Sequence, residues 1–290
     1  MKVTELLDKH NIVYRTRDIW HNVCCPFCYN DTGFHLGISD KGYATCFRCG
    51  WHSIQSVLST LLNCTYTEAK HIARSLSAGK GDFAVQYPEN KFELPSSGPV
   101  AGLARDYMYE RLCLYYDDDE FDALMKDYDI RYTEYDYPNY MYAGRIIFPN
   151  YFNGKAVSFQ GRDYLNAQPA KYITAGKQDE LVFHKNFLWG IDHVPYDKVI
   201  VCEGVMDALT IGKGAVHTHG VKWTPSQAAE LMCFDTVYIC YDTDSAGLIN
   251  AKTLAAHICH RTKVKIVRIS AKDINSCDIT EVEDLRSLLV

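Results

Sequence analysis

The stretch from Lys198 to Ile269 governs the fold of the C-terminal part of the chain: KVIVCEGVMDALTIGKGAVHTHGVKWTPSQAAELMCFDTVYICYDTDSAGLINAKTLAAHICHRTKVKIVRI. Four short apolar runs in it, KVIVC, GAVHT, TVYICYD and KVKIVRI, alternate with segments that we expect to form helices. This alternation is typical of a parallel β-sheet whose strands are joined by helices. We therefore predict a parallel α/β unit in this part of the chain.

Acidic residues follow two of the predicted strands. Glu203 follows the first strand and Asp207 lies four positions later, while Asp242 and Asp244 follow the third strand. Because neighbouring parallel strands end at the same edge of a sheet, we expect these carboxylates to converge there. A single acid at a strand end is more often a helix cap, but several acids together repel unless a cation lies among them. The pattern therefore favours a Mg²⁺ or Mn²⁺ site.

Two CxxC pairs occur in the N-terminal part, separated by seventeen residues: Cys25, Cys28, Cys46 and Cys49. This spacing matches a tetrahedral structural zinc site, in which two short turns each supply two sulfurs. A segment of about thirty residues also buries too little apolar surface to fold without such a staple. Redox dithiols or a chance pattern are the alternatives, and His21 or Cys24 could replace one of the four ligands.

Composition and charge limit the classes of protein that fit. A length of 290 residues suggests about two domains, and 47% hydrophobic residues can fill a sizeable core. The net charge of −6 argues against a wholly basic nucleic-acid-binding surface, although a local basic groove remains possible. The start, MKVTELLDKHNIVYR, has no signal-peptide pattern, and no apolar run approaches the roughly 18 residues of a membrane span. We expect a cytoplasmic protein without membrane contacts.

The acidic motifs of the C-terminal part resemble the TOPRIM signature, which primases, topoisomerases and some nucleases share. Glu203-Gly204 and Asp242-x-Asp244 carry this resemblance. Asp207 matches the primase form, in which Gly-x-Met-Asp follows the glutamate. The segment KDIN, residues 272–275, resembles the last acidic motif, and it departs from the usual pattern by having Asn275 where a second acid is common. The resemblance therefore adds Asp273 to the predicted magnesium ligands and leaves Asn275 out.

The segment before these motifs resembles DnaG-type DNA primases of bacteria and phages. Four motifs occur in the order of that family: GRIIFP (144–149), FQGR (159–162), KYI (171–173) and FHK (183–185) followed by LWG (188–190). The cysteine pairs resemble the zinc module of the same family. Many bacterial members have His where this chain has Cys28, so the all-cysteine set is more similar to phage primases fused to helicases.

The resemblance implies an α+β protein, with an N-terminal zinc ribbon and an RNA polymerase domain that contains a mixed α/β TOPRIM subdomain. We expect a zinc-binding domain at residues 1–80 and a linker, rich in Gly, Pro and Ser, at residues 81–99. The N-terminal subdomain of the RNA polymerase domain would span residues 100–196. The TOPRIM subdomain would span residues 197–290.

The resemblance also implies an activity, the synthesis of short RNA primers on single-stranded DNA from ribonucleoside triphosphates. One structural Zn²⁺ and one or two catalytic Mg²⁺ or Mn²⁺ ions would be bound. The implied catalytic residues are Glu203, Asp242 and Asp244, and the magnesium ligands are these three with Asp207 and Asp273. The residues expected to line a groove for template and nucleotide are Arg145, Arg162, Lys171 and Lys185.

Two other functions share parts of this pattern. A RecR-like recombination mediator also joins a zinc site to a TOPRIM domain without being an enzyme, but it lacks the motifs between Arg145 and Lys185. A TOPRIM nuclease or topoisomerase would use the same acids, and a topoisomerase would need a tyrosine nucleophile on a further domain. The chain ends soon after Leu288 and contains no GxxxxGK[ST] phosphate loop. We therefore expect a stand-alone primase that a replicative helicase stimulates in trans.

Overall fold

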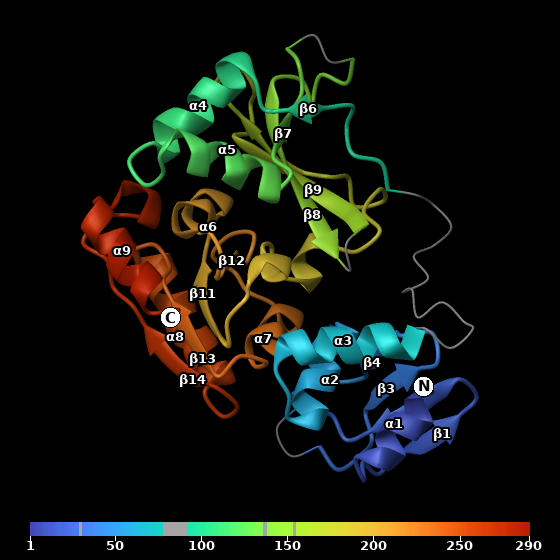
Figure 1. Ribbon diagram of the computed structural model, residues 1–290. Helices are drawn as coiled ribbons and strands as arrows, with labels where there is room; N and C mark the ends of the chain where they lie inside the picture. The colour runs from blue at the N-terminus through green and yellow to red at the C-terminus, as the bar shows by residue number, and fades with distance from the viewer. Residues whose placement is uncertain (29–30, 78–91, 136–137, 153–154) are drawn as a thin grey trace.

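The structure, a computed structural model, describes residues 1–28, 31–77, 92–135, 138–152 and 155–290. Three sheets are present among these residues, and each lies in a different part of the chain. We call these parts the N-terminal unit (residues 1–77), the central unit (residues 92–193) and the C-terminal unit (residues 198–290). Figure 1 shows the C-terminal unit between the other two.

The N-terminal unit is a small antiparallel sheet with three helices. Its strands pair in chain order: β1 (Arg15–Arg17), β2 (Trp20–Val23), β3 (Leu36–Ser39), β4 (Ala44–Cys46) and β5 (Gly50–His52). Its helices are α1 (Val3–Lys9), α2 (Ile54–Leu62) and α3 (Tyr66–Ser77). Side-chain caps define where the last two begin, because Ser53 accepts a hydrogen bond from the Ser56 N–H, and Thr65 and Glu68 form a reciprocal capping pair.

The central unit places two helices beside an antiparallel sheet. The helices are α4 (Gly102–Leu112) and α5 (Asp118–Asp127). The strands are β6 (Gly98–Pro99), β7 (Arg131–Tyr132), β8 (Arg145–Phe152), β9 (Lys155–Asp163) and β10 (Tyr172–Thr174), in the order β10-β9-β8-β7-β6. Residues 81–91 of the predicted linker lie outside the described residues, whereas its end, Gly98–Pro99, pairs with β7. The acidic run before Phe121 is exposed at the start of α5.

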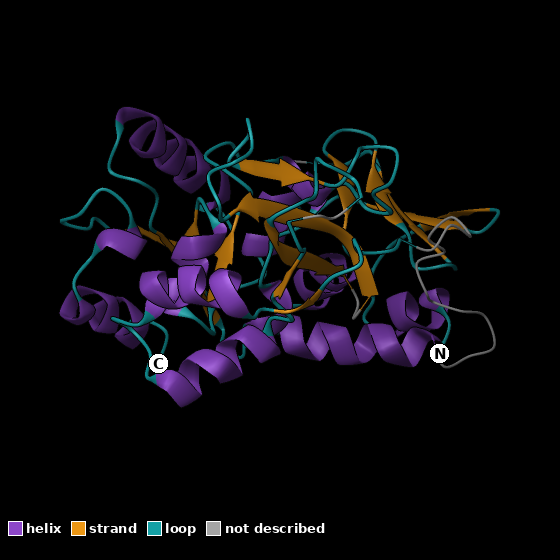
Figure 2. Cartoon of the chain, turned by 90° about the horizontal axis from the view of Figure 1, so that it is seen from above, coloured by secondary structure: helices purple, strands orange, loops and turns teal. Residues whose placement is uncertain are grey.

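The C-terminal unit is a four-stranded parallel sheet, which confirms the predicted α/β unit. Its strands are β11 (Lys198–Cys202), β12 (Ala215–His217), β13 (Thr236–Ile239) and β14 (Lys263–Ile266), in the order β12-β11-β13-β14. The connecting helices are α6 (Val205–Ile211), α7 (Pro225–Leu231) and α8 (Ser245–Ile258), and the short turn η3 (Ile274–Ser276) leads to α9 (Ile279–Ser287). Two further short turns, η1 (His184–Asn186) and η2 (Ile191–His193), precede β11. In the view from above, helices flank the central strands (Figure 2).

The two faces of the parallel sheet belong to two different cores. Because side chains alternate along a strand, Val199 and Val201 of β11 join the core that contains α7, α8 and the N-terminal unit. Ile200 and Cys202 join the core that contains α4, α5 and α6. All four side chains are fully buried. The N-terminal unit and the central unit are therefore held on opposite faces of one sheet.

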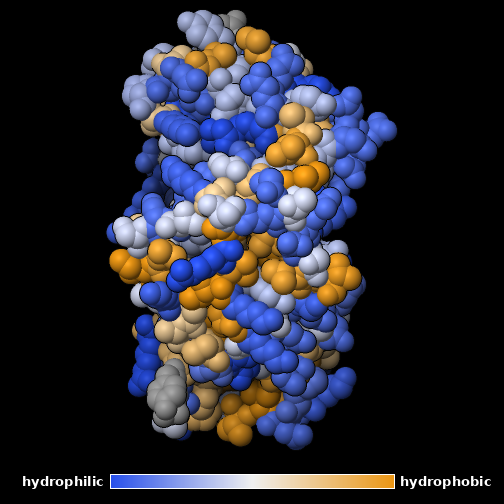
Figure 3. Space-filling view, turned by 90° about the vertical axis from the view of Figure 1, so that its left-hand side faces the viewer, coloured by the Kyte–Doolittle hydropathy of each residue, from blue (hydrophilic) through white to orange (hydrophobic). Residues whose placement is uncertain are grey.

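The surface is polar with local apolar patches. On the face shown in Figure 3, hydrophilic residues cover most of the upper part, and hydrophobic residues gather in a band near mid-height. Among the described residues, no helix combines the length and apolar character that a membrane span requires.

A buried carboxylic acid lies where the N-terminal unit packs on α7. Glu230 is completely buried and accepts a hydrogen bond from the Leu188 N–H at 2.8 Å. Around it, Ser226 Oγ donates to the Trp51 carbonyl at 2.6 Å, and Tyr66 stacks on Phe234. Burial raises the pKa of Glu230 to about 8, so its neutral form is favoured inside the protein. The negatively charged form of Glu230 would destabilise the packing of the N-terminal unit on α7.

Glu230→Gln should therefore stabilise the protein at high pH. The folded pKa of about 8 lies above the ordinary value of 4.5, so the stability linked to this group is complete below about pH 4.5 and is lost as the pH rises through 8. The glutamine keeps the acceptor and carries no charge, so the free energy of unfolding should rise by a few kcal/mol at pH 8 and by much less at pH 5. Denaturant titrations at both pH values measure this difference, and an equal effect of the substitution at both would contradict it.

Candidate functional site

The predicted acids lie at the carboxyl edge of the parallel sheet. Strands β11 and β13 are neighbours, and Glu203 and Asp242 follow their ends. Asp207 lies in the first turn of α6, Asp244 caps the N-terminus of α8 through its side chain, and Asp273 occupies the N-cap position of η3. The structure therefore brings these five acids close to one another at one edge of the sheet.

Burial and mutual repulsion raise the pKa values of three of these carboxylates. Burial and the neighbouring Asp242 carboxylate raise the pKa of Glu203 to about 7. Burial, together with Asp242 and Asp273, raises the pKa of Asp207 to about 7. Burial also raises the pKa of Asp242, and Asp273 and Asp244 add to that shift. The edge therefore concentrates negative charge with little water to screen it, and a cation would relieve the repulsion.

Hydrogen bonds fix one oxygen of four carboxylates and leave the second oxygen available to a cation. The bonds are Asp242 N–H to Glu203 Oε1 at 3.1 Å, Asn275 N–H to Asp207 Oδ1 at 3.3 Å, Gly247 N–H to Asp244 Oδ1 at 2.8 Å and Ser276 Oγ–H to Asp273 Oδ1 at 2.6 Å. Donors of this kind hold a carboxylate in one orientation before a ligand arrives.

Gly247 permits the close approach of α8 to this edge. A Cβ atom at this position would lie 2.2 Å from the Asp242 carbonyl oxygen and 2.7 Å from Glu203 Oε1. Any other residue would push the start of α8 away from the two acids. The sequence analysis did not single out this glycine, although it lies only three residues after Asp244.

The donor chemistry of the acidic edge fits magnesium. Carboxylate oxygens are the ligands that Mg²⁺ prefers, and the ion usually binds through one or two carboxylates and keeps several waters. Among the described residues, only the four cysteines form a metal-ligating group whose ligand atoms all lie within 4.8 Å of one another. The five acids do not form such a compact group, so only some of them would contact one ion, and waters would complete its coordination.

The four cysteines fit zinc closely. Their Sγ atoms lie 3.6 Å apart for Cys25 and Cys49, 3.7 Å for Cys28 and Cys46, and 3.4 Å for Cys28 and Cys49. Four sulfurs on a tetrahedral zinc with bonds of about 2.3 Å lie roughly 3.8 Å apart. One zinc ion can therefore occupy the centre with small adjustments.

Neighbouring side chains support the cysteine site. His52, a residue that the sequence analysis missed, is buried with its Nε2 3.0 Å from Cys49 Sγ, where an N–H can donate to the sulfur. Asp31 accepts the Cys25 N–H at 2.6 Å and shapes the first knuckle. His21 instead lies within hydrogen-bonding distance of Asp40 and Thr16. Neither His21 nor Cys24 is among the four-sulfur group.

Two of the four predicted groove cations hold backbone loops together. Arg145 is only 2% exposed, and its guanidinium donates to the carbonyls of Met141 and Ala170. The Lys185 ammonium donates to three carbonyl oxygens, those of Thr218, His219 and Lys222, at 2.8–2.9 Å. Burial lowers the pKa of Lys185 to about 8. In this structure both side chains are occupied by the protein itself.

The other two predicted cations lie in a basic cluster beside the acids. Arg162 is 4% exposed, lies over the rings of Tyr107 and Tyr172, and donates a hydrogen bond to each hydroxyl. Lys171 is exposed, and Arg162 is the largest cause that lowers its pKa.

Two cations that the sequence analysis did not propose, Arg111 and Lys272, also lower the pKa of Lys171, so their positive charges face it. An Arg111 Nη2–H donates to Asn275, whose own N–H donates to Asp207, so Arg111 lies beside the acidic edge. Lys272 directly precedes the last predicted acid in the chain. We call Arg111, Lys171 and Lys272 the cation cluster. Its members come from three separate segments, so only the fold brings them together.

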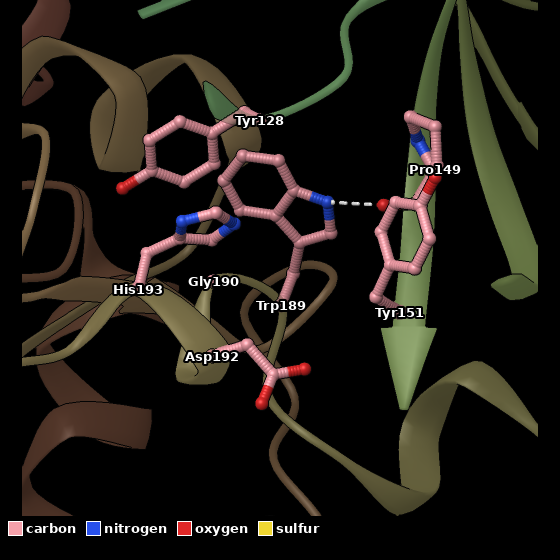
Figure 4. A pocket seen from close by; sticks show the side chains of 7 residues that line it. All are labelled: Tyr128, Pro149, Tyr151, Trp189, Gly190, Asp192 and His193. Atoms are coloured by element: carbon pink, nitrogen blue, oxygen red, sulfur yellow. Dashed lines mark hydrogen bonds between the residues drawn. The ribbon is translucent and has the colours of Figure 1, made fainter. Parts of the chain in front are cut away.

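A small cavity elsewhere in the molecule is not part of this site. It has a volume of about 20 Å³ and lies between Tyr128, Trp189 and His193, whose rings stack. Trp189 Nε1 donates to the Pro149 carbonyl at 3.0 Å, as Figure 4 shows. A space of this size holds about one water molecule. The residues around it therefore tie the end of α5 and strand β8 to residues 189–193, the last part of the central unit.

The chain is similar to several known proteins. Residues 200–278 match a family model described as Toprim-like. The DNA primase of Enterobacteria phage T4 is 26% identical over 219 residues, which cover 68% of this chain and 63% of the phage protein. The DNA primase of Campylobacter jejuni is 30% identical over 132 residues, which cover 41% of this chain and 21% of that protein. The chain thus spans less than two thirds of these relatives. The predicted resemblance to DNA primases is confirmed.

Two solved structures are also similar to the chain. The zinc-binding and RNA polymerase domains of the Aquifex aeolicus primase are 19% identical with a TM-score of 0.46, and the match covers 100% of this chain and 82% of the other. The primase fragment of the bacteriophage T7 primase-helicase protein is 16% identical with a TM-score of 0.41, and the match covers 96% of this chain and 100% of the other.

We predict one tightly bound zinc ion per chain, which Cys46→Ser should release. Structural zinc contributes an apparent ~10–16 kcal/mol in small modules, comparable with the whole stability of a domain. The N-terminal unit should therefore unfold locally while the other two units stay folded. Metal analysis and limited proteolysis measure the two effects, with Cys113→Ser at an exposed cysteine as the control. Absence of zinc from the native protein would refute the assignment.

Proposed function

We propose that this chain, a relative of DNA primases with a Toprim-like domain, synthesises short RNA primers on single-stranded DNA. The observation that carries the proposal is the meeting of two opposite groups of charges: partly buried acids at the sheet edge and a cation cluster whose Arg111 is linked to Asp207 through Asn275. A nucleoside triphosphate would fit this arrangement, because the acids at the sheet edge could hold divalent ions and the adjacent cations could bind its phosphates. The two DNA primase relatives support this choice of reaction.

Each group of residues has a distinct part in the proposed reaction. Glu203, Asp242 and Asp244 would hold one or two Mg²⁺ or Mn²⁺ ions, with Asp207 and Asp273 beside them. When bound, such ions favour attack of a 3′-hydroxyl on an α-phosphate and stabilise the pyrophosphate that leaves. The cation cluster would bind the β- and γ-phosphates and orient the triphosphate toward the acidic edge. Arg162 would keep Tyr107 and Tyr172 in place at its border.

The N-terminal unit is suited to contact the template. Phe47 lies between the two cysteines of the second knuckle and is 81% exposed, so its ring is available for stacking on an unpaired base. The same hairpin is anchored near the start of α7, because the Trp51 carbonyl accepts a hydrogen bond from Ser226 Oγ. A rigid aromatic surface held by zinc is what readout of a short sequence requires.

The partners and location remain predictions. Single-stranded DNA and ribonucleoside triphosphates follow from the proposed reaction. A replicative helicase acting in trans and a cytoplasmic location were expected from the sequence.

Asp242→Asn and Glu203→Gln should each reduce primer synthesis by on the order of a hundredfold or more. The reason is that each removes a preorganised charge at the reacting centre. Folding should survive, because the substitutions relieve repulsion among the acids. The measurement is incorporation of labelled ribonucleotides on a single-stranded template, with Asp119→Asn on the exposed first turn of α5 as the control.

The same assay separates primase from the two alternatives. A TOPRIM nuclease would shorten labelled DNA without nucleotides, and a RecR-like mediator would do neither reaction. Near-normal primer synthesis by either variant would overturn the assignment of the acids.

A further inference from the structure

Asn275 stands where the TOPRIM-like pattern commonly has a second acid, and both ends of its amide have protein partners. Its Oδ1 accepts a hydrogen bond from an Arg111 Nη2–H. Its Nδ2 donates to the Arg111 carbonyl and to Thr210 Oγ1, both at 2.9 Å. One side chain therefore joins α4 of the central unit to α6 of the C-terminal unit. Its amide oxygen is turned toward a guanidinium, which is not a metal ligand.

The backbone of Asn275 is fixed as firmly as its side chain. Its N–H donates to Asp207 Oδ1 at 3.3 Å, and its carbonyl accepts the Tyr115 hydroxyl at 3.1 Å. The Tyr115 hydroxyl also donates to the Cys277 carbonyl at 2.7 Å. The turn η3, whose N-cap position is Asp273, is thus attached to the central unit at Asn275 and at Cys277.

This attachment opposes a force that the acids themselves create. Asp207 and Asp273 lie on different segments and repel each other and Asp242. The segment around η3 has no strand pairing with the sheet among the described residues, because β14 ends at Ile266. On the side before Asp273, the Lys272 carbonyl accepts the Thr243 N–H at 3.0 Å, so that side is tied to the acidic edge. On the side after it, the attachment of Asn275 to α4 resists the movement of η3 that repulsion among the acids would favour.

We propose that Arg111 and Asn275 form a clasp that positions Asp207 and Asp273 for divalent-metal binding. Both are positioning residues in this role, since they act through the carboxylates. The inference rests on the proposed function, in which these acids hold Mg²⁺ or Mn²⁺. It makes the metal affinity of the C-terminal unit depend on a helix of the central unit.

The sign of the Arg111 effect distinguishes a clasp from simple electrostatics. Arg111 is a positive charge near Asp207, so removing it should strengthen cation binding if charge alone matters. If the clasp matters more, Arg111→Ala should weaken cation binding. Asn275→Asp makes a similar distinction, because it adds a negative charge but loses the amide donor and places an oxygen against the Arg111 carbonyl.

The experiment is titration of the full-length, zinc-loaded protein with Mn²⁺, without nucleotide or DNA, followed by electron paramagnetic resonance of the free ion. We expect Asn275→Ala, Arg111→Ala and Asn275→Asp each to weaken Mn²⁺ binding about tenfold or more. In primer synthesis, Asn275→Ala should raise the half-saturating Mg²⁺ concentration by a similar factor, and saturating Mg²⁺ should restore most of kcat. Asn250→Ala is the matched control, since its amide nitrogen bonds only the Ala246 carbonyl of its own helix.

Unchanged or tighter Mn²⁺ binding in the folded variants would overturn the clasp while leaving the proposed metal site intact. Loss of thermal stability with unchanged Mn²⁺ affinity would also overturn it, because the pair would then be only structural. Failure of the wild-type protein itself to bind Mn²⁺ would refute the proposed metal site and the clasp together.

Discussion

Repulsion among carboxylates at one edge of the parallel sheet is the constraint on which the rest of the structure depends. Glu203 and Asp242 follow adjacent strands, and burial leaves them little water to screen their charges. Backbone N–H groups donate hydrogen bonds to single carboxylate oxygens of Glu203 and Asp244 and hold them in place. Gly247 allows the start of α8 to approach the same edge. These arrangements hold the acids together but do not neutralise them. A divalent cation would neutralise the remaining charge, so the repulsion among the carboxylates also favours the proposed binding of a cation.

The two outer units are organised by the two faces of the same sheet. Alternate side chains of β11 enter different cores, so Val201 packs toward the N-terminal unit and Ile200 toward the central unit. The central unit supplies Lys171 and Arg111 to the cation cluster. The N-terminal unit presents an exposed Phe47 on a knuckle whose cysteines fit zinc. One buried sheet therefore fixes the relation between the acids proposed to bind metal, the cations proposed to bind phosphate and the surface proposed to contact the template.

Features with a local sequence pattern could be predicted, and features that depend on packing could not. The parallel unit and the four-cysteine site follow from periodicity and spacing, which short-range geometry dictates. Arg145 and Lys185 lie in recognisable motifs, but no spacing along the chain tells which carbonyl oxygens their charges will meet. Arg111 lies 164 positions before Asn275, and only the packing of α4 against α6 brings the two together. The acidic edge was thus foreseeable, whereas most of its supporting residues were not.

Proton release on metal binding measures directly whether the carboxylates at the sheet edge repel one another until a cation binds. Near neutral pH, the raised pKa values of about 7 keep Glu203 and Asp207 partly protonated, and a metal ion requires their charged forms. Titration calorimetry with Mg²⁺ at pH 6.5, in buffers of different ionisation enthalpy, measures the number of protons released. We expect the release of on the order of one proton per chain, and we expect this number to decrease as the pH rises above 8. Binding of Mg²⁺ without proton release, or no binding at all, would contradict it.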